Sequence, residues 1–245
     1  MKLHWPRGVA SATKPVKEHH MERGVVVITG GQGVLGSAAA GLAREQGWTV
    51  ALIDHEPGDA REPGLMTIGG IDLTDPAQAK AAMDKAGEAL GGIDALLNVA
   101  GGFVWQKTEA DDPAHEKMFR LNVLTCLHAT RAALPWLRKS PEGRIVNVGA
   151  AGALKAEAGM GAYAASKSGV HRLTEALARE LQDCCVTVNA VLPSILDTPQ
   201  NRKDMPDADP KDWVAPRDLA AVMLFLASPE ARAVRGALVP VTGRV

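Results

Sequence analysis

The sequence of 245 residues is poor in aromatic side chains, which make up only 4% of it, and it contains a single tyrosine, Tyr163. A core must therefore be built from aliphatic residues, and an apolar share of 46% is enough to cover both faces of a buried sheet. The net charge is −1 and no long basic run occurs, so we expect no nucleic-acid partner. No apolar stretch approaches the length that spans a bilayer, so we expect no membrane partner.

Cysteine is also scarce, and Cys126, Cys184 and Cys185 have neither zinc nor redox spacing, so no metal site is expected. All three lie in helix- or strand-like sequence, which indicates small buried apolar residues of a reducing compartment, the cytoplasm. Residues 1–23 have no periodic apolar pattern and lack the apolar core of a secretory signal. We interpret them as a loosely ordered extension, or as a start codon placed upstream of Met21, rather than as a targeting segment.

From residue 24 onward, apolar β-branched runs alternate with helical patterns. We expect strands at 25–29, 49–54, 65–71, 93–99, 143–149, 186–192 and 236–241, and helices at 33–46, 75–90, within 113–138, at 161–183 and at 216–227. Strands that are apolar on both faces and alternate with helices predict a parallel sheet covered on both sides. The prediction is one doubly wound α/β domain of the Rossmann type over residues 24–245, with a mostly parallel seven-stranded sheet.

One crossover departs from this regular alternation. Residues 55–64 contain two prolines and two glycines, which makes a full helix improbable there. We therefore expect a loop.

A glycine-rich turn follows the first expected strand, in the run Thr29-Gly30-Gly31-Gln32-Gly33-Val34-Leu35-Gly36, and a helix comes next. Glycines let the backbone turn tightly and approach a pyrophosphate, and the helix N-terminus offers free N–H groups and a positive dipole end. The strand before and the helix after are the context that supports a dinucleotide site. The alternative is a β–α turn that binds nothing.

Asp54 ends the second expected strand. In this geometry a carboxylate accepts hydrogen bonds from the hydroxyls of the adenosine ribose, and its charge would repel a 2′-phosphate. The glycine-rich turn holds no lysine or arginine. We therefore expect NAD(H) rather than NADP(H). The alternative is that Asp54 only caps the turn after it.

Tyr163 stands four residues before Lys167 in a segment with helical periodicity, so the two side chains share one helix face. A nearby cation favours phenolate over phenol, which predicts that the tyrosine pKa falls from about 10 toward working pH. A phenol so placed is a general acid or base for a hydroxyl or carbonyl oxygen. The alternative is an unremarkable pair on a partly exposed helix.

Together these segments resemble the short-chain dehydrogenase/reductase family over residues 24–245. The signatures that carry the resemblance occur in order: the 29–36 turn, Asp72 with Leu73, Asn98-Val99-Ala100-Gly101, Asn122, Tyr163 with Lys167, and Pro193 followed by Leu196 and Thr198. The resemblance implies an NAD-dependent oxidoreductase with Tyr163, Lys167 and Asn122 as catalytic residues. It implies cofactor contacts from Gly30, Gln32, Gly33, Val34, Leu35, Gly36, Asp54, Asp72, Leu73, Asn98, Ala100, Gly101, Tyr163, Lys167, Pro193, Leu196 and Thr198.

Within that resemblance, each segment has an implied task. Asp72 and Leu73 would hold the adenine, and Asn98 with Ala100 and Gly101 would line the adenosine side and the centre of the sheet. Lys167 would bond the nicotinamide ribose. Asn122 would hold a water of the proton relay. Leu196 and Thr198 would contact the nicotinamide carboxamide.

The chain departs from the family pattern at three positions. Val34 stands where the turn usually has glycine, so we expect Gly33 to take over the close approach, and Ser194 replaces a glycine after Pro193. The third departure is chemical, because the family's catalytic serine position is Ala150, and no hydroxyl residue occurs between Gly149 and Ala162. Losing one such donor typically lowers a rate about 10²–10³-fold when the reaction needs it.

A local resemblance extends to the quinonoid dihydropteridine reductases, which keep the tyrosine and lysine but lack the serine. It is carried above all by residues 196–209, Leu-Asp-Thr-Pro-Gln-Asn-Arg-Lys-Asp-Met-Pro-Asp-Ala-Asp, with Trp213 beyond. The missing serine favours reduction of an electron-poor molecule by NADH. We expect the pocket to be walled by Phe103, Trp105, Met160 and the loop 197–213. Phe103 and Trp105 suggest a flat, stacked substrate, and the alternative is that these aromatics only pack. The alternatives are an alcohol or 3-oxoacyl dehydrogenase that works without its serine, and a non-catalytic NAD-binding sensor or scaffold.

The resemblance also implies a homodimer or homotetramer, since the family pairs two equivalent long helices with those of a neighbour. Apolar residues lie around much of the surface of the two corresponding segments here: Leu124, Leu127, Val170, Leu173 and Leu177. The alternative is that all of them face the sheet.

Overall fold

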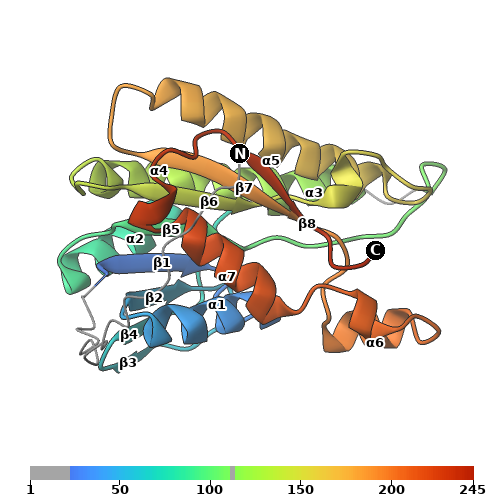
Figure 1. Ribbon diagram of the computed structural model, residues 1–245, viewed down its shortest axis with the longest axis horizontal. Helices are drawn as coiled ribbons and strands as arrows, with labels where there is room; N and C mark the ends of the chain where they lie inside the picture. The colour runs from blue at the N-terminus through green and yellow to red at the C-terminus, as the bar shows by residue number, and fades with distance from the viewer. Residues whose placement is uncertain (1–22, 111–113) are drawn as a thin grey trace, which may run out of the picture.

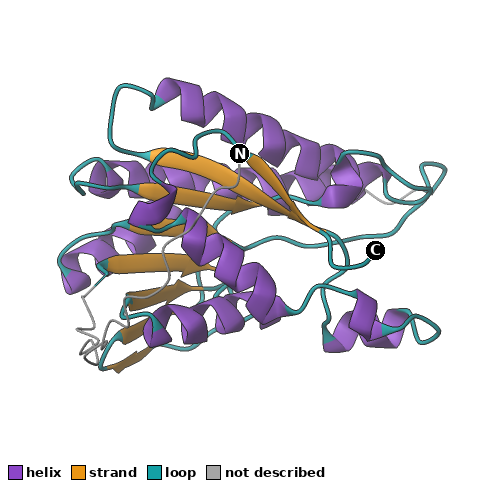
Figure 2. Ribbon diagram, in the orientation of Figure 1, coloured by secondary structure: helices purple, strands orange, loops and turns teal. Residues whose placement is uncertain are grey.

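The computed structural model describes residues 23–110 and 114–245. An eight-stranded sheet forms the middle layer, with helices on both faces (Figures 1 and 2). The strand order is β3-β4-β2-β1-β5-β6-β7-β8. The bounds are β1 Val25–Thr29, β2 Thr49–Ile53, β3 Ala60–Glu62, β4 Leu65–Ile68, β5 Ala95–Asn98, β6 Arg144–Val148, β7 Thr187–Pro193 and β8 Leu238–Val241.

All strand pairs except β3–β4 are parallel. Parallel strands joined by helical crossovers are buried on both faces, which explains why β1, β5, β6 and β7 have no exposed residue. The prediction of a mostly parallel, doubly wound α/β domain is confirmed. Residues 1–22 lie outside the described residues, and so does the interpretation of the N-terminal extension.

The described residues form seven α-helices, two of which are joined by a π-helical segment. Their bounds are α1 Val34–Glu45, α2 Pro76–Leu90, α3 Ala114–Met118, α4 Thr125–Leu137, α5 Gly161–Glu180, α6 Pro199–Asp204 and α7 Pro216–Leu226. The π-helix, Phe119–Leu124, joins α3 to α4 within the long helix expected at 113–138. Asp75 caps α2 as expected, with its side chain accepting from the Ala77 N–H at 2.8 Å.

The helices divide into two layers that bury separate aliphatic clusters. Helices α1 and α7 pack on one face, over residues such as Ile28, Leu97 and Val146. Helices α2, α4 and α5 pack on the other, over Ile53 and Ile145. Short α6 stands apart from both layers, past the carboxyl ends of the strands (Figure 1). The carboxyl edge of the sheet is therefore where loops from many strands converge.

The expectation of a loop at residues 55–64 was wrong in part, and the sheet has eight strands rather than seven. Ala60–Glu62 forms β3 and pairs antiparallel with β4. Pro63 and Gly64 make the two-residue turn between them, and Gly64 has a φ of +73°, which glycine adopts without strain. The Pro-Gly pair that argues against a helix is thus what folds the hairpin.

The expectation for the cysteines was also wrong in part. Cys126 is buried, but Cys184 is half-buried and Cys185 is exposed. Both follow the end of α5, where the chain turns toward β7, and a turn on the surface leaves side chains uncovered.

Candidate active site at the carboxyl edge of the sheet

The glycine-rich turn is fixed to the ends of three neighbouring strands. The Thr29 hydroxyl accepts from the N–H groups of Val99 and Ala100, at 3.1 and 3.2 Å, which ties the end of β1 to the segment after β5. The Gly30 N–H donates to the carbonyl of Ile53 at the end of β2. The turn is therefore rigidly placed before α1 begins.

The glycines of this turn have two different reasons to lack a side chain. A Cβ on Gly36 would lie 2.2 Å from the Gly30 carbonyl oxygen, and one on Gly31 would lie 2.6 Å from the Leu52 side chain. The protein's own packing thus requires those two. A Cβ on Gly33, by contrast, would meet only the Gly30 oxygen at 3.4 Å, an ordinary contact.

Gly33 is exposed and is the N-cap residue of α1, so its open side faces outward beside the free N–H groups of the helix start. A bare backbone at a helix N-terminus is the surface that a pyrophosphate contacts. The residues present fit a dinucleotide at this place.

Asp54 lies in the adjoining turn, nearly buried at 5% exposure. One carboxylate oxygen accepts from the Gln32 N–H at 2.8 Å, and the other accepts from the Glu56 N–H at 3.1 Å and lies 2.9 Å from His55 Nδ1. Asp54 therefore does cap the surrounding turns. A carboxylate offers about four acceptor positions, so these contacts leave capacity for a ribose hydroxyl.

The segment expected to hold the adenine follows β4. Asp72 is exposed and its Oδ1 accepts from the Thr74 N–H at 2.8 Å, whereas Leu73 is buried. Asn98, by contrast, lies in the centre of the sheet, where its amide donates to Asn147 and Thr130 at 2.9 and 3.0 Å. Its side chain fastens β5 to its neighbours and is buried, at 3% exposure, and its contact with a cofactor stays a prediction.

Tyr163 and Lys167 lie on one face of α5, but the expected lowering of the tyrosine pKa is wrong for this structure. Burial raises the pKa of Tyr163 to about 12 and lowers that of Lys167 to about 8. The ammonium of Lys167 does not offset the burial of the phenol, and it donates instead to the Val148 carbonyl oxygen at 2.7 Å. At neutral pH the tyrosine is a protonated phenol, which is the form of a proton donor.

Asn122 is brought beside these residues by the π-helical segment. Its amide donates to the Gly102 carbonyl at 3.1 Å and to the Ser166 hydroxyl at 2.9 Å, and its Oδ1 accepts from the Gly102 N–H at 2.9 Å. A Cβ on Gly101 would lie 2.6 Å from Asn122 Oδ1 and 3.3 Å from Lys167 Nζ. The side chain of Asn122 thus fixes the loop after β5 against α5, and its polar atoms are engaged in doing so.

Ala150 is the second residue after β6 and is 3% exposed. Its N–H donates to Nε2 of His171 at 3.2 Å, a contact that the sequence analysis did not anticipate. The signal was available, because Tyr163, Lys167 and His171 recur at a spacing of four along α5. The Ser166 hydroxyl does not replace the missing serine, since it donates to the Tyr163 carbonyl at 2.7 Å.

The segment after β7 contributes the remaining expected residues. Pro193 ends β7 in register with Val241, and Thr198 caps α6 by accepting from the Asn201 N–H at 3.1 Å. The Leu196 carbonyl accepts from the Asn201 amide at 2.8 Å. A bidentate ion pair between Asp197 and Arg202, at 2.5 and 2.7 Å, braces the turn into α6. The segment from Pro193 to Arg202 therefore forms a loop at the carboxyl edge that is held by its own hydrogen bonds and ion pair.

An aromatic wall borders Tyr163. The ring of Phe103 meets the tyrosine ring edge to face at 4.9 Å, and Phe103 is 57% exposed. Trp105 lies on the same loop, and its indole would be 2.2 Å from a Cβ on Gly159 of the loop after β6. The Gln106 N–H donates to the Gly159 carbonyl at 2.7 Å, which joins the loops that follow β5 and β6.

The match to a family model settles the classification. The model described as short chain dehydrogenase covers residues 24–209. The chain belongs to the short-chain dehydrogenase family. This family binds nicotinamide cofactors, in keeping with the open glycine-rich turn at the start of α1.

Individual short-chain dehydrogenases resemble this chain along most of its length. The 2-(S)-hydroxypropyl-CoM dehydrogenase 3 of Xanthobacter autotrophicus is 30% identical over 92% of this chain and 97% of its own. The structure of a 3-ketoacyl-(acyl-carrier-protein) reductase from Brucella melitensis complexed with NADH is 27% identical, with a TM-score of 0.79 over 91% of this chain and 98% of that one. A short-chain oxidoreductase from Pseudomonas aeruginosa PAO1, described as containing an atypical catalytic center, is 26% identical, with a TM-score of 0.81 over 91% and 97%.

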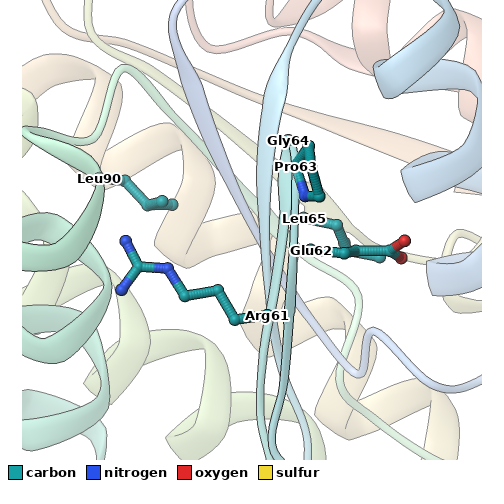
Figure 3. Close-up of a pocket in the computed structure, with 6 residues that line it drawn as sticks. All are labelled: Arg61, Glu62, Pro63, Gly64, Leu65 and Leu90. Atoms are coloured by element: carbon teal, nitrogen blue, oxygen red, sulfur yellow. The ribbon is translucent and has the colours of Figure 1, made fainter.

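A surface pocket of about 390 Å³ lies away from this site (Figure 3). It is lined by Arg61 and Glu62 of β3, by the Pro63–Gly64 turn, and by Leu65 and Leu90. These residues stand at the start of β4 and the end of α2, on the amino-terminal side of the sheet. The pocket has no part in the site of a short-chain dehydrogenase, whose ligands bind at the carboxyl edge.

The long helices leave some apolar surface. Val170 and Leu177 are buried within the single chain, whereas Leu124, Leu127 and Leu173 are half-buried. Neither the paired-helix oligomer nor its alternative is tested by a single chain. Among the helices of residues 23–110 and 114–245, none has the length and hydropathy to cross a membrane.

Proposed function

We propose that the protein is an NADH-dependent reductase of flat, electron-poor molecules, such as a quinonoid dihydropterin, an imine or a quinone. The observation that carries the proposal is that Ala150 offers a substrate no hydrogen-bond donor. The position has no hydroxyl, and its backbone N–H is already donated to His171. Neither the side chain nor this N–H can polarise a substrate carbonyl, so the substrate must be one that needs a single proton donor.

The cofactor-binding residues in this proposal are the glycine-rich turn, Asp54, the Asp72–Leu73 segment and the loop after Pro193. NADH supplies a hydride when bound. No lysine or arginine occurs in the turn, and Asp54 would repel a 2′-phosphate. Asp54 keeps acceptor positions for a ribose, which supports NAD(H) over NADP(H).

Tyr163 is the proton donor. Because burial raises its pKa to about 12, the phenol is protonated at neutral pH, which suits the reductive direction. Lys167 is held by the Val148 carbonyl and, with a pKa lowered to about 8, is mostly an ammonium at neutral pH. It stabilises the phenolate that develops as the proton leaves.

Two further observations support a flat substrate. Phe103 exposes most of its ring while touching Tyr163, and a planar molecule can stack against such a ring. The run 196–209 resembles the corresponding loop of the quinonoid dihydropteridine reductases. That likeness rests on this sequence segment, whereas the relatives named above are dehydrogenases and a 3-ketoacyl reductase.

Those relatives favour a second candidate, reduction of a 3-oxoacyl or similar carbonyl group. Under this candidate a water or another backbone N–H replaces the serine. Adding the hydroxyl by Ala150→Ser should then raise carbonyl reduction, by up to about 10²–10³-fold.

The deciding experiment follows NADH oxidation by the purified protein with quinonoid dihydropterin, a quinone, ketones and a 3-oxoacyl thioester. Turnover of the pterin or the quinone, unimproved by Ala150→Ser, is the expected result. Turnover of ketones or thioesters alone, improved by Ala150→Ser, would transfer the assignment to the carbonyl reductases. Binding of NADH with no turnover of any substrate would leave the non-catalytic sensor or scaffold as the better account.

A further inference from the structure

The end of β6 is held by α5 through two consecutive contacts. The Val148 carbonyl accepts from Lys167 Nζ at 2.7 Å, and the Ala150 N–H donates to His171 Nε2 at 3.2 Å. Lys167 and His171 are one helical turn apart, so they meet the two consecutive peptide groups on either side of Gly149. Gly149 lies between these contacts.

Gly149 is fixed from the other side by the sheet. Its N–H donates to the Val191 carbonyl of β7 at 2.9 Å. A Cβ on Gly149 would lie 2.5 Å from His171 Nε2, so the glycine allows the imidazole to approach the strand. The strand end is therefore immobilised between β7 and two side chains of α5.

His171 can make its contact only as a neutral ring. Since Nε2 accepts a hydrogen bond, the ring proton must be on Nδ1. The side chain is 2% exposed, and burial, together with the charges of Arg172 and Lys167, lowers the His171 pKa to about 4. The acceptor state is thus maintained at any pH at which a reductase of this kind would work.

We propose that His171 is a positioning residue that fixes the Ala150 peptide and, with it, the end of β6 to which Lys167 is bonded. Its contact also withdraws the Ala150 N–H from the substrate. The hydrogen bond itself is independent of the proposed function, whereas its effect on turnover rests on that function.

The first test is spectroscopic and needs no substrate. In the full-length protein labelled with ¹⁵N, a through-hydrogen-bond coupling between the Ala150 amide and His171 Nε2, and a ring shift typical of the Nδ1–H tautomer, are expected. Ala150 amide exchange should be at least about tenfold faster in His171→Leu than in the parent. It should return toward the parent rate in His171→Gln, whose amide oxygen can accept the same bond. Arg179→Gln, exposed on the same helix, is the matched control and should leave the exchange rate unchanged.

The second test measures turnover. His171→Leu should lower kcat by about tenfold or more with the NADH affinity retained, because the strand end that holds Lys167 would shift, and a shift of a fraction of an ångström slows chemistry more than binding. His171→Gln should restore most of kcat. An unchanged Ala150 exchange rate in His171→Leu, or an Nε2–H tautomer in the parent, would overturn the proposal. A confirmed hydrogen bond in a protein that reduces nothing would count against the proposed function and leave the hydrogen bond standing.

Discussion

Lys167 donates its ammonium to the carbonyl oxygen of Val148 at 2.7 Å, in the buried space between α5 and the end of β6. This contact places the charge beside the loop after β5, because a Cβ on Gly101 would lie 3.3 Å from the same nitrogen. A buried cation of this kind is held by few partners, so its protonation state depends strongly on its surroundings.

The first prediction concerns the pH dependence of reduction. Burial lowers the Lys167 pKa to about 8, so the ammonium is present below that pH and is lost as the pH rises through it. The rate constant for reduction should be level at neutral pH and fall above about pH 8. Tyr163, with a pKa raised to about 12, does not cause this fall in the rate constant. The measurement is kcat/KM for the oxidised substrate between pH 6 and 10.

Lys167→Arg provides the control for that assignment, because a guanidinium stays protonated throughout the range. The kcat/KM of this variant at neutral pH should be lower than that of the parent, since a planar group cannot reproduce the contact with Val148. The fall in kcat/KM above about pH 8 should be absent. A fall that persists unchanged in the arginine variant would show that another group titrates.

The second prediction concerns the phenol. Tyr163→Phe should reduce hydride transfer by about 10²–10⁴-fold, the usual contribution of general acid catalysis, while NADH affinity changes little. Stopped-flow measurement of NADH oxidation and a fluorescence titration of NADH separate the two effects. Phe103→Leu is a useful companion, since it removes the ring that contacts Tyr163 and leaves the phenol in place. Normal turnover by Tyr163→Phe would exclude the proposed role.

The third prediction separates the two kinds of glycine in the first turn. Gly33→Ala should leave the free energy of unfolding within about 0.5 kcal/mol of the parent. It should nevertheless lower the affinity for NADH at least about tenfold. The added methyl would meet little of the protein but would stand on the open side of the turn.

Gly36→Ala should instead lower the free energy of unfolding by about 1–3 kcal/mol, because its Cβ would lie 2.2 Å from the Gly30 oxygen. Gly41→Ala is the matched control within α1, where a Cβ meets nothing within 4 Å, and should stabilise the protein by about 0.5–1 kcal/mol. Urea denaturation and NADH titration of all three variants provide the comparison. Equal loss of NADH binding in Gly41→Ala and Gly33→Ala would contradict the assignment of the open side.

The fourth prediction concerns cofactor choice. Asp54→Ser removes a buried negative charge and keeps one hydroxyl acceptor for the Gln32 N–H. The ratio of kcat/KM for NADPH to that for NADH should rise about tenfold or more, which corresponds to about 1.4 kcal/mol. Glu56→Gln removes a nearby exposed charge and should change the ratio by less than about twofold, since exposed charges are screened. A parent enzyme that already prefers NADPH would refute the proposed cofactor.

The order of elements could be read from the sequence because each depends on neighbours along the chain. Val25–Thr29 is an uninterrupted apolar β-branched run, and Asp75 with Pro76 marks the start of α2 by local capping chemistry. The glycine-rich turn and the spacing of Tyr163 and Lys167 are local in the same sense. The hairpin of β3 could not be predicted in the same way, because a Pro-Gly pair excludes a helix in every context but makes a hairpin turn only where the flanking residues pair.

The sequence by itself determined the parallel α/β architecture, the position of the glycine-rich turn and the shared helix face of Tyr163 and Lys167, because periodicity and spacing act over a few residues. Only the tertiary structure decided the rest. Burial, which depends on segments distant in sequence, raises the Tyr163 pKa where the neighbouring lysine alone would lower it. The same long-range packing brings His171 onto the N–H of Ala150, twenty-one residues away, and turns Asn122 toward Gly102.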